Sequence, residues 1–264
     1  MKLLRNLLAI ACAFAATSAS MSAIAADATT MRFGLEAQYP PFESKGANGE
    51  LQGFDIDIGN AVCATAHLKC SWVETSFDGL IPALQGRKFD AINSAMNATE
   101  KRRQAIEFTN IIYRVPTQLI ARNGSGLVPT PESLKGKRVG VLQASIQETY
   151  AKAHWEPAGV NVVSYQDQNQ VYADLVSGRL DATLVLAPAG QTGFLSRPDG
   201  KDFSFVGQPV RDDRILGSGI AFGLRKGDDS LKKQLDAAIA KVQADGTVKT
   251  LAHKYFGSID VSPK

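Results

Sequence analysis

The sequence contains few of the residue types on which side-chain catalysis depends. Its 264 residues include three histidines and three cysteines. The histidines are widely separated, at His67, His154 and His253, and show no metal-ligand spacing. The sequence also shows no Ser/His/Asp grouping and no phosphate-binding loop. We therefore expect neither a metal nor another cofactor. Lys and Arg (29) nearly balance Asp and Glu (26), and nucleic-acid binding needs a clustered excess of positive charge, so we expect no nucleic-acid partner.

The apolar run near the N-terminus is short. Residues 7–16 fall well below the roughly 20 residues that a membrane-spanning helix needs, which disfavours a membrane anchor. Lys2 and Arg5 precede the run and Ala23-Ile24-Ala25 follows it, the pattern of a cleaved export signal. We expect residues 1–25 to be a signal peptide, with the mature chain starting at Ala26 in the periplasm. Removal of Lys2 and Arg5 lowers the net charge from +3 to +1.

Two cysteines remain once the signal peptide is removed. Cys12 lies inside that peptide, with almost no apolar run before it, which disfavours lipoprotein processing. Cys63 and Cys70 are seven residues apart, and two such cysteines can pair in an oxidising compartment. A disulfide here would stabilise the fold by about 2 kcal/mol through loop-closure entropy. The alternative is a metal site, for which only His67 lies nearby.

The stretch Gly53–Cys63 is expected to form an amphipathic helix after a tight glycine turn. Asp55 and Asp57 place negative charge near the start of this helix, where the helix dipole favours it. The preceding residues 31–35 alternate as a strand. The apolar residues of the helix recur at i, i+4, i+7 and i+8 on one face; they are Phe54, Ile58, Ala61 and Val62.

The rest of the chain repeats the alternation of strand, loop and helix. Thr99, Ser145 and Asn169 are expected to cap helices, with Ser145–Glu148 as a capping box. The clearest helix runs from Leu231 to near Gly246. Further strands and one turn-rich surface stretch are predicted from the hydrophobic pattern: strands at 71–74, 89–93, 139–142, 160–165, 181–186 and 220–224, and the surface stretch at 190–201.

Two extended segments divide the chain into lobes. Tyr113–Leu119 is apolar and broken by a proline, and 208–218 is extended and loop-like. We interpret them as two crossings between a first lobe, residues 26–114 and 215–264, and a second lobe with the hinge segments, residues 115–214. The predicted fold is therefore α/β with two lobes. A ligand in the cleft between them would stabilise the closed arrangement by contacting both sides.

Several ordered motifs carry a family resemblance across essentially the whole mature chain. They are Tyr39-Pro40-Pro41-Phe42, Gly53–Ile58, the Cys63/Cys70 pair, Phe77–Pro82, Thr99–Arg102, Val139–Gln143 and Lys254-Tyr255-Phe256. In these motifs the sequence resembles the family 3 periplasmic solute-binding proteins of ABC importers, nearest to the branch that binds lysine/arginine/ornithine, histidine and opines. The resemblance implies the type II periplasmic-binding-protein fold, with the ligand in the interlobe cleft.

Arg102 is the first candidate for ligand binding. It falls in the first turn of the helix capped by Thr99, where a cation opposes the helix dipole, so an anion is the better reason for its presence. The alternative is a solvated surface arginine like its neighbour Arg103. The resemblance implies that Arg102 grips the α-carboxylate of the ligand, aided by backbone amides at Asn97 and Ile146. A planar guanidinium suits that task because it binds a carboxylate through two hydrogen bonds.

Glu36, Tyr39 and Phe77 are candidates for the other end of the ligand. By the resemblance, Glu36 stands where binders of basic amino acids carry an acid for the distal cation. Tyr39 and Phe77 would enclose the aliphatic stem and stack on a guanidinium. The alternatives are a solvated loop acid for Glu36 and core packing for the two aromatic residues.

Leu186 departs from the family pattern. Most relatives have an aspartate at this position that pairs with the ligand's α-ammonium, and its loss would weaken the contact by roughly 1.5–3 kcal/mol. Ligands with a substituted α-nitrogen, such as opines, would suit the change. The remaining positions that the resemblance places around the ligand are Ser94, Ala95, Met96, Asn97, Leu142, Ser145, Ile146 and Gln147.

The sequence thus predicts a monomeric, periplasmic binding component of an ABC transporter rather than an enzyme. We expect it to capture a polar, basic amino acid and to deliver it to an inner-membrane permease. Two alternatives remain open: a binding protein for an opine or another N-substituted amino acid, and a dehydratase of the cyclohexadienyl type on the same fold, with Glu36 as its acid or base. A receptor domain would need an output segment, which we do not expect here.

Overall fold

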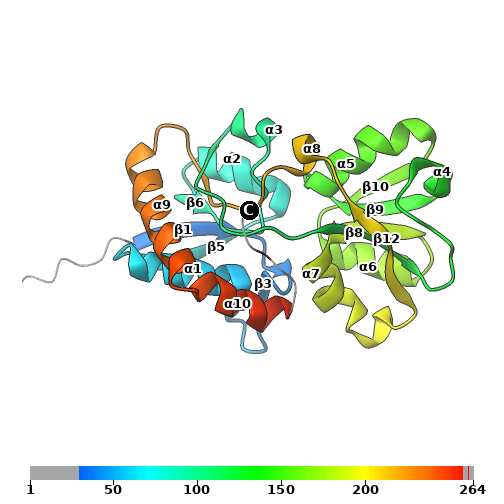
Figure 1. Ribbon diagram of the computed structural model, residues 1–264, viewed down its shortest axis with the longest axis horizontal. Helices are drawn as coiled ribbons and strands as arrows, with labels where there is room; N and C mark the ends of the chain where they lie inside the picture. The colour runs from blue at the N-terminus through cyan, green and yellow to red at the C-terminus, as the bar shows by residue number, and fades with distance from the viewer. Residues whose placement is uncertain (1–29, 258–260, 262–264) are drawn as a thin grey trace, which may run out of the picture.

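The computed structural model describes residues 30–257 and Val261 (Figure 1). The predicted signal peptide lies outside these residues. The described part of the chain forms two α/β lobes side by side, each built on its own five-stranded sheet. Lobe 1 holds the blue, cyan and orange-red segments of Figure 1, and lobe 2 the green and yellow ones. None of the described helices is long and apolar enough to cross a membrane.

The sheet of lobe 1 is mixed. Its first strand β1 runs parallel to β5 and β6, and β13, which returns late in the chain, runs antiparallel to β6 and β7. In spatial order the strands are β5 (Lys69–Glu74), β1 (Thr30–Leu35), β6 (Ala91–Ile92), β13 (Gly223–Leu224) and β7 (Glu107–Phe108). A small antiparallel sheet adjoins it, formed by β2 (Gln38–Tyr39), β3 (Glu43–Lys45) and β4 (Leu51–Gln52).

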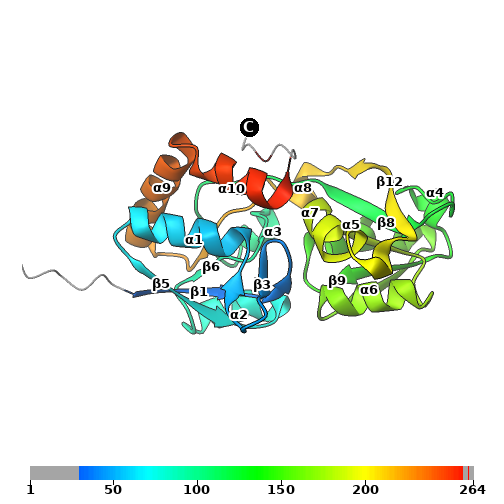
Figure 2. The same cartoon turned by 90° about the horizontal axis from the view of Figure 1, so that it is seen from below.

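Helices cover the sheet of lobe 1 because each has one apolar face. Helix α1 (Phe54–Thr65) packs against α9 (Asp229–Ala244) and α10 (Thr247–Phe256) on one side of the sheet, and α2 (Leu80–Gln85) lies on the other (Figure 2). The expected glycine turn precedes α1. Gly53 has φ 136°, and a Cβ there would stand 2.2 Å from the Phe42 carbonyl oxygen, so glycine is required.

Lobe 2 repeats the plan. Strand β9 runs parallel to β10 and β11, and β8 pairs antiparallel with β11 and β12. The strands in spatial order are β10 (Asn161–Tyr165), β9 (Arg138–Leu142), β11 (Ala182–Leu186), β8 (Thr117–Arg122) and β12 (Phe203–Val210). The helices of this lobe are α4 (Pro131–Leu134), α5 (Ile146–His154), α6 (Gln168–Val176) and α7 (Ala187–Gly190).

Two segments connect the lobes and pair with each other. The chain leaves lobe 1 after β7 and returns after β12 and the short helix α8 (Asp213–Leu216), as Figure 1 shows. Between the lobes, Tyr113 and Ile220 form an isolated β-bridge. The two-lobe α/β prediction is confirmed, while the lobe boundaries at residues 114/115 and 214/215 stay a prediction.

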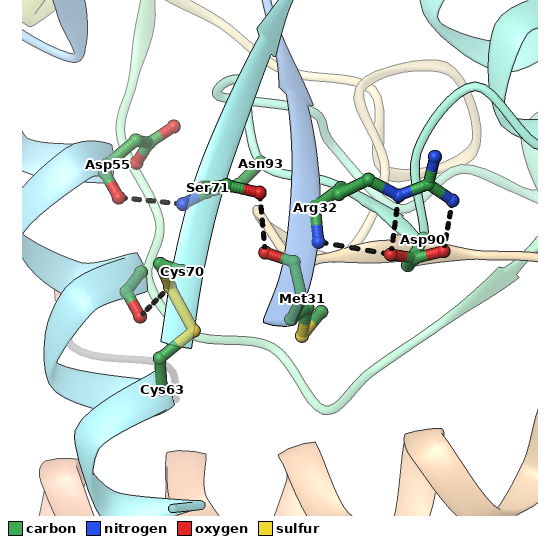
Figure 3. Close-up of a disulfide and its surroundings, with 9 residues drawn as sticks. Met31, Arg32, Asp55, Cys63, Cys70, Ser71, Asp90 and Asn93 are labelled. Atoms are coloured by element: carbon green, nitrogen blue, oxygen red, sulfur yellow. Dashed lines mark hydrogen bonds and ion pairs between the residues drawn. A yellow bond between two sulfur atoms is a disulfide. The ribbon is translucent and has the colours of Figure 1, made fainter. Parts of the chain in front are cut away.

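The predicted disulfide is present. Cys63 at the end of α1 is bonded to Cys70 in β5, with Cα atoms 5.9 Å apart, and Cys70 Sγ also lies 3.2 Å from the Gly59 carbonyl oxygen (Figure 3). The bond ties the C-terminal part of α1 to the edge strand of the lobe 1 sheet.

Several local predictions were wrong. Helix α6 is capped by Asp167, which accepts a hydrogen bond from the Gln170 N–H, and not by Asn169. The predicted strand 220–224 shrinks to Gly223–Leu224, and 89–93 shrinks to Ala91–Ile92. Ile220 lies outside the strand and forms isolated β-bridges with Asn97 and Tyr113 instead. Residues 190–201 are not a plain surface stretch, since Gln191–Leu195 forms a π-helical turn that buries Phe194 against Tyr172.

Candidate functional site

The candidate site lies where the parallel strands of both sheets end. Glu36 follows β1, Ser94–Asn97 follow β6, and Phe77 follows β5 by a short loop. In lobe 2, Ser145 follows β9 and Leu186 ends β11. The paired register of these strands brings their carboxyl ends to a common edge, where open α/β sheets bind ligands.

Ten of the thirteen predicted ligand-binding residues line one cavity between the lobes. This inner cavity has a volume of about 20 Å³. Its lining residues from lobe 1 are Tyr39, Phe77, Ala95, Asn97 and Arg102, and those from lobe 2 are Leu142, Ser145, Ile146, Gln147 and Leu186. Of the other three, Ser94 and Met96 are buried beside it, and Glu36 lines a neighbouring, larger cavity. Ligand contact by these residues stays a prediction.

Arg102 joins the two lobes. It belongs to α3 (Glu100–Arg103), whose cap Thr99 accepts a hydrogen bond of 3.2 Å from the Arg102 N–H. The guanidinium donates to the carbonyl oxygens of Asn97 (2.9 Å) and Ala144 (3.0 Å), and its central carbon lies 5.4 Å from the Phe77 ring centroid. Burial lowers the pKa of Arg102 to about 10, so the group is still a cation at neutral pH. It is therefore a fixed positive charge on the wall of the inner cavity.

The start of helix α5 supplies the opposite wall. Ser145 Oγ accepts from the Glu148 N–H at 3.0 Å, as a helix cap does. The second half of the predicted capping box is different, because the Glu148 carboxylate accepts from the N–H of Ala144 (2.6 Å) instead of Ser145. Ala144 has φ 59°, an uncommon backbone conformation for a residue with a side chain. The hydrogen bond that the Ala144 N–H donates to Glu148 holds that turn in place beside the cavity.

A buried carboxylate, that of Asp55, holds the loop Ser94–Asn97 of lobe 1. From the sequence, its expected role was limited to a favourable interaction with the helix dipole. Asp55 is fully buried and accepts hydrogen bonds from the Ala95 N–H (2.6 Å) and the Tyr113 hydroxyl (2.7 Å). Ala95 has φ 43°, so it too is in the left-handed region. Burial raises the pKa of Asp55 to about 6, while the two hydrogen bonds oppose the rise.

Glu43 is a second buried acid that sequence reasoning missed. Its Oε1 accepts from the Ser94 hydroxyl at 2.7 Å, and the same hydroxyl oxygen accepts from the Glu36 N–H at 3.1 Å. Burial and the neighbouring Asp55 raise the pKa of Glu43 well above its ordinary value, which favours the protonated acid. No sequence signal separates Glu43 from the other polar residues of its loop, because its burial depends on contacts with α1 and the Ser94 loop.

Glu36 is a third buried carboxyl group at the cleft. It is 4% exposed, and neither of its carboxylate oxygens has a hydrogen-bond partner among the described residues. Burial raises its pKa to about 8, and the negative charges of Asp167 and Asp78 add to the rise. An arriving cation would reverse this situation, because it would favour the ionised form and satisfy the orphan oxygens. The alternative of a solvated loop acid is thus wrong.

None of the described residues that line the inner cavity carries a carboxylate. Leu186, only 3% exposed, presents an apolar side chain from lobe 2. Tyr39 and Phe77 are 7% and 9% exposed, so they serve both as cavity wall and as core, and Tyr39 stacks on Phe42 with ring centroids 5.7 Å apart. The cavity therefore offers one cation, two aromatic rings, the start of a helix and apolar side chains.

Other chemistries find little support in the described part of the chain. None of its His, Cys, Asp and Glu side chains gather in threes that could hold a metal. The three histidines do not line the inner cavity; His154 lies on lobe 2, with its Nε2 2.7 Å from Asp212 Oδ2.

Comparisons with known proteins agree with this geometry. A profile of the bacterial extracellular solute-binding proteins, family 3, matches residues 31–258. The chain is 46% identical over 241 residues to the histidine-binding periplasmic protein of Escherichia coli K12, covering 91% of this chain and 93% of that protein. It is 47% identical over 239 residues to the lysine/arginine/ornithine-binding periplasmic protein of the same strain, covering 90% and 92%.

A solved structure agrees as well. An arginine-specific periplasmic binding protein of Salmonella typhimurium superposes with a TM-score of 0.80 at 31% identity, covering 87% of this chain and all of that one. These relatives carry the names of binding proteins and not of enzymes. The chain belongs to the bacterial extracellular solute-binding proteins, family 3.

Proposed function

We propose that the protein captures a basic L-amino acid in the periplasm and delivers it to an inner-membrane ABC permease. The observation that carries the proposal is the placement of a buried cation and a buried acid on the cleft. Arg102 lines the inner cavity, and Glu36, buried with two unpartnered oxygens, lines the larger neighbouring cavity. An α-carboxylate at Arg102 and a side-chain cation at Glu36 would be joined by an aliphatic stem along the aromatic rings.

Both lobes contribute to the grip. Arg102 and the backbone N–H of Asn97 belong to lobe 1, whereas the backbone N–H of Ile146 at the start of α5 belongs to lobe 2. A carboxylate bound by both sets favours the closed arrangement over the open one, because only the closed one lets all of them reach it. The permease would then recognise the closed form of a monomer, from which a signal peptide of 25 residues has been removed.

A second candidate ligand follows from Leu186. The described lining of the inner cavity has no acid that could pair with a free α-ammonium. An amino acid with a substituted α-nitrogen, such as an opine, therefore gives up no favourable ion pair in binding here. The Nδ2 of Asn97 donates to the Leu216 carbonyl at 3.0 Å, which leaves its Oδ1 as an acceptor. A plain α-ammonium would therefore use the Asn97 Oδ1 or backbone carbonyls such as that of Ser94, and none of these carries a negative charge.

A thermal-shift screen of the mature protein separates these candidates. A ligand that binds only the folded state raises the melting temperature. We expect shifts with arginine, ornithine, lysine or histidine and none with neutral amino acids. Shifts with octopine or nopaline alone would replace the first candidate by the second. Incubation with prephenate or arogenate tests the remaining alternative, an enzyme of the cyclohexadienyl dehydratase type, and turnover of either compound would refute a purely binding role.

A further inference from the structure

A second and larger cavity adjoins the inner one at the cleft. This outer cavity has a volume of about 640 Å³, within the roughly 300–1,000 Å³ range of small-molecule pockets. Lobe 1 contributes segments 36–45 and 74–76 to its wall, and lobe 2 contributes 166–169 and Arg197. The lobes meet beside it, where Asn169 Nδ2 lies 3.4 Å from Gln38 Oε1. The outer cavity is therefore a space that both lobes enclose.

Neighbouring residues of the same two segments line both cavities. Tyr39 and Phe77 face the inner cavity, whereas their direct neighbours in the chain, Gln38 and Ser76, face the outer one. Glu36 also lines the outer cavity, with both carboxylate oxygens buried and unpartnered. A cation that reaches Glu36 past the aromatic rings consequently arrives at the border of the outer cavity.

The charges around the outer cavity are largely neutralised by one another. Lys45 Nζ lies 2.8 Å from Glu74 Oε2, and Arg197 Nε lies 3.5 Å from Asp199 Oδ1. Asp167 keeps its negative charge while it caps α6. The rest of the lining consists mainly of amide and hydroxyl side chains with some apolar surface. Such a lining suits an uncharged extension of a ligand better than a second formal charge.

We propose that the outer cavity receives substituents carried on the distal nitrogen of the ligand. The inference rests on the proposed function and names a ligand class within it: basic amino acids whose distal nitrogen is N-alkylated and still cationic. The positive charge must be kept because Glu36 is the acid that receives it. The substituent then continues past Glu36 into the outer cavity, where 640 Å³ leaves room for several carbon atoms.

Isothermal titration calorimetry with arginine, Nω-methylarginine and Nω-propylarginine tests this. We expect the propyl compound to bind within about tenfold of arginine, whereas a closed pocket that rejects extra methylenes would weaken it by about 100-fold or more. If arginine binds but the propyl compound is weakened by about 100-fold or more, the outer-cavity proposal is overturned and the proposed function stands. Failure of arginine and every analogue to bind overturns the proposed function and this inference together.

A variant that fills the outer cavity supplies an independent test. Ser76 is exposed and makes no side-chain capping bond, so Ser76→Trp should fold and occupy part of the space. We expect the variant to weaken Nω-propylarginine by about tenfold while arginine changes by less than about threefold. Ser230→Trp, at an exposed position in the first turn of α9, is the matched control. Equal weakening of both ligands by Ser76→Trp contradicts the proposal.

Discussion

The guanidinium of Arg102 in lobe 1 donates a 3.0 Å hydrogen bond to the carbonyl oxygen of Ala144 in lobe 2. The same group donates to Asn97 within its own lobe. Arg102 thus connects the two walls of the cleft at the position where a ligand carboxylate is expected. We therefore expect both carboxylate binding and lobe closure to depend on the Arg102 side chain.

Replacing Arg102 by alanine should abolish binding of carboxylate ligands. The variant loses a charge-assisted, two-pronged hydrogen bond and one interlobe contact, and we expect affinity to fall by about 100-fold or more, equivalent to about 2.7 kcal/mol. Isothermal titration calorimetry against arginine measures this. Arg103→Ala is the control, because Arg103 contacts Glu107 and Phe108 away from the cavity. If the affinity of Arg102→Ala for arginine were unchanged, the assignment of the ligand site would be wrong.

Replacing Asp55 by asparagine should damage both stability and binding. An amide at this position turns one acceptor into a donor that faces the Ala95 N–H or the Tyr113 hydroxyl. We expect unfolding free energy to drop by about 1–3 kcal/mol. Ligand affinity should fall as well, because Ala95 loses the bond that holds its left-handed conformation. Urea unfolding and calorimetry read the two effects separately.

Asp57 offers a matched control in the same helical turn. Its carboxylate accepts from Lys254 Nζ (2.9 Å) and the Tyr255 hydroxyl (2.7 Å) at the protein surface. Surface pairs of this kind contribute about 0–1 kcal/mol, so Asp57→Asn should change unfolding free energy little and ligand affinity not at all. Similar losses in the Asp55 and Asp57 variants would show that Asp55 has no special role in the site.

Breaking the disulfide should affect stability without affecting binding. The Cys63–Cys70 bond closes a short loop at the far end of α1 from the Asp55 carboxylate (Figure 3). The double variant Cys63→Ser/Cys70→Ser should lose about 2 kcal/mol of unfolding free energy through added chain entropy. The dissociation constant for arginine should match that of the wild type. A large change in that constant would mean that the bond also shapes the binding loops.

The sequence predicted which residues gather at the inner cavity where a residue's own type and position carry the signal. Arg102 opposes the dipole of its helix, and Ser145 is a helix cap at a strand end, so both have local reasons to face the cleft. The paired strands of each lobe could be found because their apolar patterns are long. These caps, charges and apolar patterns are local features of the sequence, so they can be read without knowing the fold.

What the sequence could not predict depends on contacts between distant segments. Glu43 and Asp55 are far from Ser94 in the chain, and only folding places them under the Ser94–Ala95 loop. The division into an inner and an outer cavity depends on lobe closure in the same way. The missed cap at Asp167 has a local cause, because Asp and Asn two residues apart are equally good caps and only the packing of α6 decides between them.

The affinity for arginine should rise with pH between about 6 and 8. Glu36 has a pKa of about 8, so below that pH the free protein must lose a proton before it can pair with a cation. Affinity should therefore increase by up to about tenfold per pH unit and level off above pH 8. Calorimetry in buffers of different ionisation enthalpy should show proton release near pH 7. Glu36→Gln should remove both effects and weaken cationic ligands while leaving neutral ones unchanged.

The ionisation of Glu36 should have the opposite effect on the stability of the protein without ligand, which should fall as pH rises. A carboxyl group with a raised pKa in the folded state stabilises that state below its unfolded pKa, near 4.5, and this contribution is lost as pH rises toward 8. The upper limit of the loss is about 1.4 kcal/mol per pH unit in that window. Glu36→Gln lacks the titrating group, so its stability relative to wild type should grow from pH 5 to pH 8.5. Urea unfolding at the two pH values checks this, and a constant difference would show that Glu36 titrates as an ordinary exposed acid.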